Sequence, residues 1–164
     1  MSRPPRLASH DYIGGWRYSL TICAWQRTQV FRDQRTVDLV WEQFRYTALH
    51  ERCEITAYCF MPDHAHFLVA GVEEDSDFLQ FVSLAKQRSG WRYRRGSLHP
   101  LWQEGYYERV LRSDEDSPGV ARYILGNPLR AGLVDRVEDY PFWGSSAYSR
   151  AELIDYVGEY SGRT

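Results

Sequence analysis

The stretch ITAYCFMPDHAHFLVA, residues 55–70, decides the fold. Both of its halves are rich in β-branched and aromatic residues, which favour strands. Pro62 and Asp63 between the halves are typical of a turn. The stretch therefore predicts two antiparallel strands over residues 55–60 and 64–70.

The flanking sequence predicts helices and two more strands. Residues 16–25 alternate between apolar and polar side chains, and residues 101–111 show a weaker strand pattern. Helical spacing of apolar residues predicts helices over residues 36–52 and from about 76 to 88. Ser117 and Pro118 are typical of a helix start, and Asn127-Pro128 predicts its end near Gly126. Residues 89–100 are predicted to be a basic loop, and residues 135–164 an acidic, loosely structured tail.

This order of elements, β-α-β-β-α-β-α, predicts an α+β domain with a mainly antiparallel sheet. The chain has 164 residues, of which 43% are hydrophobic, so one domain with a real core is expected. No apolar run is long enough to cross a membrane, and the start of the chain lacks the apolar segment of a secretory signal. Three cysteines, an odd number, argue against a disulfide scaffold and favour a reducing cytoplasm.

The net charge of −2 conceals an uneven distribution. Basic residues outnumber acidic ones between residues 81 and 112, where aromatic residues are interleaved, and the reverse holds after residue 135. Basic groups and flat rings suit single-stranded nucleic acid, although a solvated face beside core aromatics gives the same pattern. The candidate nucleic-acid-binding residues are Arg3, Arg6, Arg17, Lys86, Arg88, Arg92, Arg94, Arg95 and Trp102.

His64 and His66 are the candidate metal ligands. Residues two apart in a strand point to the same face, so these imidazoles are expected to lie side by side. Two neutral imidazoles can hold one divalent metal and leave coordination positions open for catalysis. Two alternatives stay open: histidines that only make hydrogen bonds at a sheet edge, and a structural zinc site that includes Cys53 or Cys59.

Tyr123 and Asn127 lie one turn apart and off the apolar stripe of the helix predicted from residue 117. A phenol outside the core can act as a nucleophile, and a neighbouring amide oxygen can complete a metal site. The alternatives are a rim aromatic residue and a simple helix terminator.

Several blocks of sequence together resemble the single-tyrosine HUH transposases of the insertion-sequence two-hundred type, and among them the REP-associated tyrosine transposases. REP denotes repetitive extragenic palindromes. The likeness covers residues 12–148. The blocks are VFRD at 30–33, AYCFMPDHAHFLV at 57–69, LWQEGY at 101–106, YILGNPLRAGLV at 123–134, DYP at 139–141 and Ser145-Ser146.

The resemblance implies a ferredoxin-like (RRM-like) fold for residues 16–148, with an arm over residues 1–15 and a tail over 149–164. It implies that His64, His66 and Asn127 hold Mg²⁺ or Mn²⁺. It also implies that Tyr123 attacks single-stranded DNA beside a hairpin, leaving a 5′-phosphotyrosine and a 3′-hydroxyl. The arm, with Gly14 and Gly15, is implied to read a guide sequence at the foot of the hairpin.

The chain departs from the family pattern at two places. Asp63 stands where asparagine is commoner, and residues 142–145 contain an extra residue. A catalytically quiet hairpin-binding protein is therefore kept as an alternative, as is a zinc-stabilised structural protein. Both a monomer and a homodimer, in which the tyrosine acts on the partner's histidines, are compatible with the sequence. A bacterial, nucleoid-associated location in the cytoplasm is expected.

Overall fold

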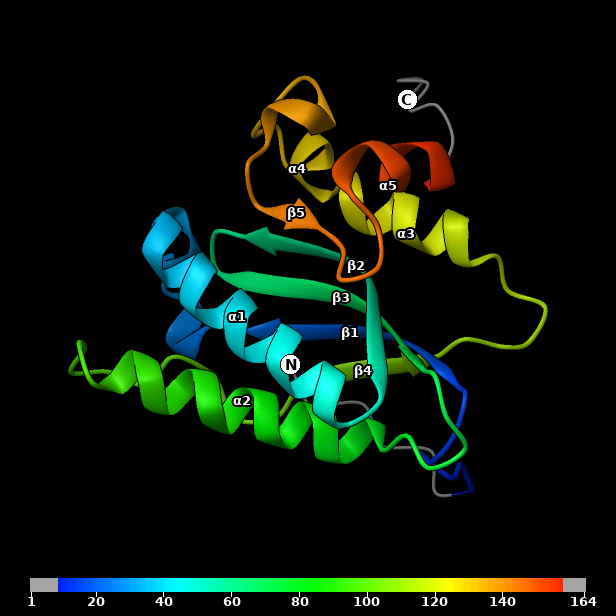
Figure 1. The fold of residues 1–164 in the computed structure, drawn as a ribbon. Helices are drawn as coiled ribbons and strands as arrows, with labels where there is room; N and C mark the ends of the chain where they lie inside the picture. Colours follow the sequence, from blue (N-terminus) through cyan, green and yellow to red (C-terminus); the bar gives the residue numbers. More distant parts are fainter. Residues whose placement is uncertain (1–8, 158–164) are drawn as a thin grey trace.

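A computed structural model describes residues 9–157 as a five-stranded antiparallel sheet with helices on both faces (Figure 1). The sheet order is β4-β1-β3-β2-β5. The strands are β1 (Arg17–Cys23), β2 (Cys53–Met61), β3 (His64–Gly71), β4 (Tyr107–Val110) and β5 (Trp143–Gly144). The α-helices are α1 (Gln34–His50), α2 (Phe78–Arg94), α3 (Ser117–Leu125), α4 (Asn127–Arg130) and α5 (Arg150–Val157). Three 3₁₀ turns are η1 (Trp25–Arg27), η2 (Val30–Arg32) and η3 (Val137–Asp139).

The first six regular elements confirm the predicted ferredoxin-like fold. They follow one another as β1-α1-β2-β3-α2-β4, and their strands lie in the order 4-1-3-2 with every pair antiparallel. The strand β5 extends this sheet beyond β2. Helices α1 and α2 cover one face, and α3, α4 and α5 lie on the other (Figure 1).

The predicted hairpin forms the middle of the sheet. Strands β2 and β3 are joined at Pro62-Asp63, and Met61 pairs with His64 and Cys59 with His66. Alternate residues of β3 point to opposite faces. Phe67 is fully buried on the α1 side, where its ring stacks on Phe44 with centroids 4.6 Å apart. The even-numbered residues of β3 consequently face α3.

Two predicted elements had wrong boundaries. Helix α2 runs to Arg94, so the expected loop begins later, because Ser89 is satisfied inside the core. Its hydroxyl donates to the Ala85 carbonyl at 2.6 Å and accepts from Trp102 Nε1 at 2.9 Å. The last strand of the ferredoxin-like unit, predicted over residues 101–111, is only Tyr107–Val110.

The acidic segment after residue 135 is not loosely structured within the described residues. Trp143 belongs to β5, and α5 packs against α3. Leu153 and Val157, one turn apart, are both fully buried in the second apolar cluster, on the α3 side of the sheet. The high acidic content hid this narrow apolar stripe.

Residues 9–15 are irregular, as predicted, but they pack on the domain. Tyr12 is buried, and the Gly14 amide donates to the Ser76 carbonyl at 2.8 Å. No helix in the described part of the chain is long and apolar enough to cross a membrane.

The burial of α5 predicts the effect of Leu153→Ala. Removing this fully buried side chain should lower the free energy of unfolding by about 2–5 kcal/mol, because it leaves a cavity under α5. Leu98→Ala, at a side chain that is 90% exposed, should change it by less than about 0.5 kcal/mol. Urea unfolding measures both values, and equal stabilities for the two variants would contradict the packing of α5.

Candidate metal and nucleophile site

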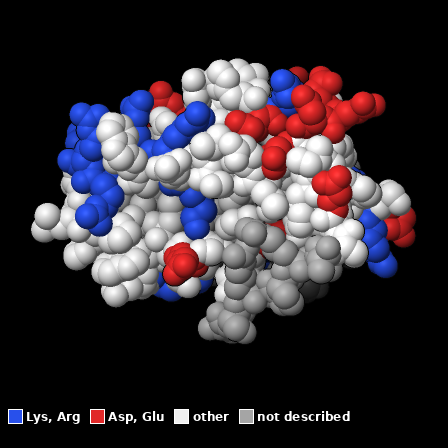
Figure 2. Space-filling model, turned by 90° about the horizontal axis from the view of Figure 1, so that it is seen from below, with Lys and Arg blue, Asp and Glu red and all other residues white. Residues whose placement is uncertain are grey.

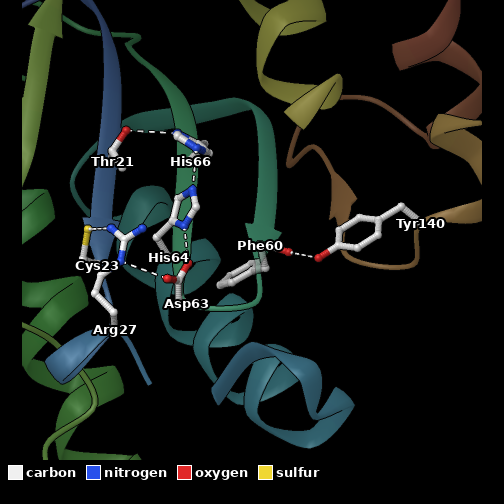
Figure 3. Close-up of polar contacts among 8 residues, drawn as sticks. All are labelled: Thr21, Cys23, Arg27, Phe60, Asp63, His64, His66 and Tyr140. Carbon is white, nitrogen blue, oxygen red and sulfur yellow. Dashed lines mark hydrogen bonds and ion pairs between the residues drawn. The ribbon is translucent and has the colours of Figure 1, made fainter. Parts of the chain in front are cut away.

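His64 and His66 lie side by side on the α3 face of β3, as the strand period predicts. Their Nε2 atoms are 3.0 Å apart, and their rings are nearly perpendicular, at 86°. Neighbouring strands flank the pair: Cys23 of β1 is opposite His64, and Thr21 of β1 is opposite His66. Figure 3 shows the two imidazoles in line along the strand.

A chain of polar contacts orients His64 (Figure 3). Asp63 Oδ1 lies 2.6 Å from His64 Nδ1, and Asp63 Oδ2 accepts from Arg27 Nε at 2.9 Å. Burial alone would raise the pKa of Asp63, but the hydrogen bond with His64 and the charge of Arg27 hold it below its ordinary value. The ionised carboxylate can only accept, so His64 Nδ1 carries a proton and Nε2 presents a lone pair when the ring is neutral.

The other histidine is held by Thr21, whose Oγ1 lies 3.0 Å from His66 Nδ1. Burial lowers the pKa of His66 to about 3, and the positive charges of His64, Arg130 and Arg27 act in the same direction. His66 is therefore neutral at physiological pH. A hydroxyl both donates and accepts, so Thr21 supports either tautomer of His66. With Nδ1 protonated, His66 Nε2 also presents a lone pair.

This donor set fits a divalent metal. Two imidazoles converge at their Nε2 atoms, and each has a hydrogen-bonded Nδ1, which is the usual support for a ligating histidine. Within residues 9–157, no third His, Cys, Asp or Glu completes a cluster with them. The zinc alternative gains no support from this, since Cys59 is fully buried in the second apolar cluster. A third protein ligand would have to come from an amide, of which Asn127 is the candidate.

Tyr123 is on the solvent side of α3, as its position off the apolar stripe predicts. It is 63% exposed, whereas Ile124 and Leu125 are buried. The Arg130 guanidinium lies over the Tyr123 ring, 3.9 Å from its centroid. Arg130 Nη2 also donates to Asn127 Oδ1 at 2.9 Å and to the Tyr123 carbonyl. The three side chains therefore form one cluster at the junction of α3 and α4.

Helix α3 packs against β2 and β3 of the same chain, and α4 packs against β2. The tyrosine cluster consequently lies on the sheet face that carries the histidines. The charge of Arg130 acts on the pKa values of His66 and of Cys59, both of which are on that face.

Several predicted DNA-binding residues are engaged elsewhere. Arg17 donates to the Glu115 and Arg112 carbonyls and to the Ser117 hydroxyl, so it ties β1 to the start of α3. Lys86 Nζ donates to the carbonyls of Gln103 and Gly105.

The predictions for Arg88 and for the two arginines of the arm have different outcomes. Arg88 donates to the Thr47 hydroxyl at 3.0 Å and packs over the Tyr46 ring. Arg3 and Arg6 lie outside the described residues.

The last turn of α2 exposes the remaining predicted cations, Arg92 and Arg94, together with the C-cap residue Arg95. Arg92 lines a groove of about 520 Å³ between α1 and α2, with Arg88 also in its lining. Figure 2 shows Lys and Arg gathered at this end of the molecule and Asp and Glu at the other. The basic bias of the sequence is thus a real surface feature.

Trp102 does not fit its predicted role. It is 8% exposed, and its indole NH donates to the Ser89 hydroxyl inside the core. The exposed indole at the basic end is Trp91, which is 62% exposed and lies beside Arg95. Because α2 continues past residue 88, Trp91 lies on the helix but off its apolar stripe, which distinguishes it from Trp102.

The supporting residues were not predicted. Asp63 was noted only as a departure from the family pattern, and Thr21, Arg27 and Arg130 were not assigned to the site. Thr21 could have been found from strand pairing opposite His66. Arg27 could not, because it adopts a left-handed φ of 56° that no motif announces.

Comparisons show which known proteins this chain is similar to. The family described as "Transposase IS200 like" matches residues 13–127. A protein of Haemophilus influenzae, provisionally named a REP-associated tyrosine transposase, is 25% identical over 157 residues, 87% of each chain. The REP-associated tyrosine transposase of Escherichia coli is 31% identical over 90 residues, 54% of this chain and 52% of that one. A solved REP-associated tyrosine transposase bound to a REP hairpin has a TM-score of 0.72 and 25% identity, covering 87% of this chain and 82% of the other.

The low pKa of His66 predicts how stability depends on pH. In metal-free protein the free energy of unfolding should fall as pH drops from about 6.5 towards about 3, because His66 binds a proton when unfolded but not when folded. The free energy of unfolding should change by up to about 1.4 kcal/mol per pH unit. Urea unfolding with EDTA, repeated over this pH range, measures it.

His66→Gln should remove that contribution, while His50→Gln, at an exposed histidine of α1, should keep it. A wild-type pH dependence identical to that of His66→Gln would show that folded His66 titrates normally.

Proposed function

This chain belongs to the IS200-like transposase family, and we propose that it cleaves and rejoins single-stranded DNA beside REP-like hairpins through a covalent bond to Tyr123. The observation that carries the proposal is the convergence of two imidazoles, at their Nε2 atoms, on the sheet face against which the tyrosine helix packs. A nucleophile and a cation site on one face are what phosphodiester cleavage needs.

The metal of this proposal is Mg²⁺ or Mn²⁺, held by His64 and His66 with Asn127 as the third ligand. Such a cation, when bound, polarises the scissile phosphate and offsets the negative charge of the transition state. The chain's own contribution is orientation. Asp63 and Thr21 fix the two rings so that both Nε2 atoms face one point.

In the proposed reaction the Tyr123 phenol loses its proton, and its oxygen forms a bond to phosphorus. The bond between phosphorus and the 3′-oxygen breaks in line with this attack. The leaving oxygen takes up a proton and becomes a 3′-hydroxyl, while the 5′-phosphate stays on the tyrosine. A 3′-hydroxyl that attacks this phosphotyrosine reverses the step and joins strands without an external energy source.

The site is proposed to act within one chain. In support of this, α3 packs on β2 and β3 of its own chain, and Arg130, which contacts the Tyr123 ring, lowers the pKa of His66. Chromosomal palindromes as the substrate place the protein on the nucleoid of a bacterial cytoplasm.

The basic end of α2 is the proposed surface for the DNA backbone. Arg92, Arg94 and Arg95 are exposed there, and Trp91 offers a flat face for a base. The solved relative bound to a REP hairpin supports hairpin DNA as the ligand. The acidic opposite end, with exposed Glu73, Glu74 and Asp75, repels a duplex and so limits how it can lie.

A cleavage assay tests the reaction. Labelled single-stranded oligonucleotides that carry palindromes flanking the coding sequence are incubated with protein and Mn²⁺ or Mg²⁺. Wild type should form a covalent adduct that survives a denaturing gel, and Tyr123→Phe should form none. His64→Ala should lower the rate by about 100-fold or more, because it removes a metal ligand.

Omission of the metal with EDTA should give the same loss as His64→Ala. Hairpin binding without any adduct would instead support a DNA-binding protein that has no catalytic activity. An adduct of undiminished yield with Tyr123→Phe would show that another residue is the nucleophile.

The DNA surface has its own prediction. Arg92→Ala combined with Trp91→Ala should weaken hairpin binding by about tenfold or more and reduce its salt dependence, because phosphate and stacking contacts are lost. Arg52→Ala is the matched control, since Arg52 pairs with Asp75 at the acidic end. Fluorescence anisotropy at several salt concentrations measures binding, and equal affinities for the double variant and the control would exclude this surface.

A further inference from the structure

Arg130 contacts two residues of the proposed site, although it has no role in the reaction as proposed. Its guanidinium lies 3.9 Å from the centroid of the Tyr123 ring, and its Nη2 atom donates to Asn127 Oδ1 at 2.9 Å. One cation thus contacts both the proposed nucleophile and the proposed third ligand. It sits on the sheet face of His66, whose pKa its charge helps to lower.

Within residues 9–157, no carboxylate forms an ion pair with Arg130, whereas several other arginines do have carboxylate partners. Both hydrogen bonds that Arg130 makes to described residues come from Nη2, so the donors on Nε and Nη1 are available to a ligand. Arg130 is also exposed, so a ligand can reach it.

An arginine with free donors in a planar fork is suited to the non-bridging oxygens of a phosphate. The ring of Tyr123, packed against one face of the guanidinium, restricts where the phenol oxygen can lie relative to that fork. A phosphate bound by the remaining donors is therefore brought to the side of the nucleophile.

On the basis of the proposed function, we propose that Arg130 binds the scissile phosphate and holds Tyr123 in position for attack on it. The covalent step is the one written above, and Arg130 transfers no proton in it. Its donors contact the phosphate oxygens, on which negative charge increases as the phenol oxygen bonds to phosphorus.

A purely structural role for Arg130 predicts a different result for the binding of phosphate. The hydrogen bond from Arg130 to the Tyr123 carbonyl also caps the last turn of α3. A cap affects stability and the position of the helix, but it does not distinguish a charged phosphate from a neutral one.

The test therefore compares two DNA probes in two protein backgrounds. The probes are the palindrome-bearing oligonucleotides above, with either a phosphodiester or an uncharged methylphosphonate at the cleavage position. Binding is measured on Tyr123→Phe, which cannot form the adduct but keeps the ring beneath Arg130. Tyr123→Phe should prefer the phosphodiester by about tenfold or more, and the added Arg130→Ala should abolish that preference.

Arg130→Lys keeps the charge without the fork and should retain part of the preference. Arg136→Ala is the matched control, because Arg136 is an exposed arginine nearby in sequence that faces Glu138 at 3.7 Å. With Tyr123 restored, Arg130→Ala should slow adduct formation by about 100-fold or more, and Arg136→Ala should not.

A phosphodiester preference that survives Arg130→Ala, or that is absent from Tyr123→Phe with Arg130 intact, overturns the proposal even if the variant is slow or unstable. Absence of an adduct with wild type contradicts the proposed function instead, and the binding comparison still settles whether Arg130 contacts the phosphate. Thermal unfolding of each variant shows how far the helix cap contributes.

Discussion

The alternating direction of the side chains along β3 is the constraint on which the site depends. Its odd-numbered residues, such as Ala65 and Phe67, fill the core against α1 and α2, so its even-numbered residues must face α3. A slip of one residue in the pairing with β2 would turn both histidines toward the aromatic rings of the α1 side and Phe67 toward α3. The free energy of the core therefore fixes the register, and the register places two imidazoles on the α3 face.

Once the rings are on that face, their environment sets their chemistry. Burial disfavours a charge on His66, and the neighbouring cations add to that effect, so its nitrogen is free to bind a metal at neutral pH. Asp63 orients the ring of His64 by accepting from its Nδ1, so that its Nε2 faces His66. The two histidines are held by different partners, a hydroxyl for His66 and a carboxylate for His64.

Much of this arrangement follows from local sequence, and the rest depends on tertiary contacts. Pro62-Asp63 and strand alternation were enough to predict the hairpin and the paired histidines, and helical spacing was enough to place Tyr123 outside the core. The end of α2 could not be predicted, because Ser89 is stabilised in the helix by Trp102 from a distant loop. That contact also explains why Trp102 was mistaken for a surface aromatic.

The supporting residues of the site illustrate the same limit. Arg27 reaches Asp63 only through a left-handed turn, and Arg130 of α4 lies over the ring of Tyr123 of α3. The turn at Arg27 has no periodicity or motif that marks it. Contacts between side chains from different elements are set by packing, and a sequence pattern read along one element does not contain them.

The central claim is that the two histidines form a preorganised site for one divalent cation. Titration of metal-free protein with Mn²⁺, followed by calorimetry and electron paramagnetic resonance, tests it most directly. The account predicts one Mn²⁺ per chain, about tenfold weaker binding in Thr21→Val, where the support of His66 is lost, and none at this site in His66→Ala. Mn²⁺ binding that is absent from wild type, or unchanged in His66→Ala, would contradict it.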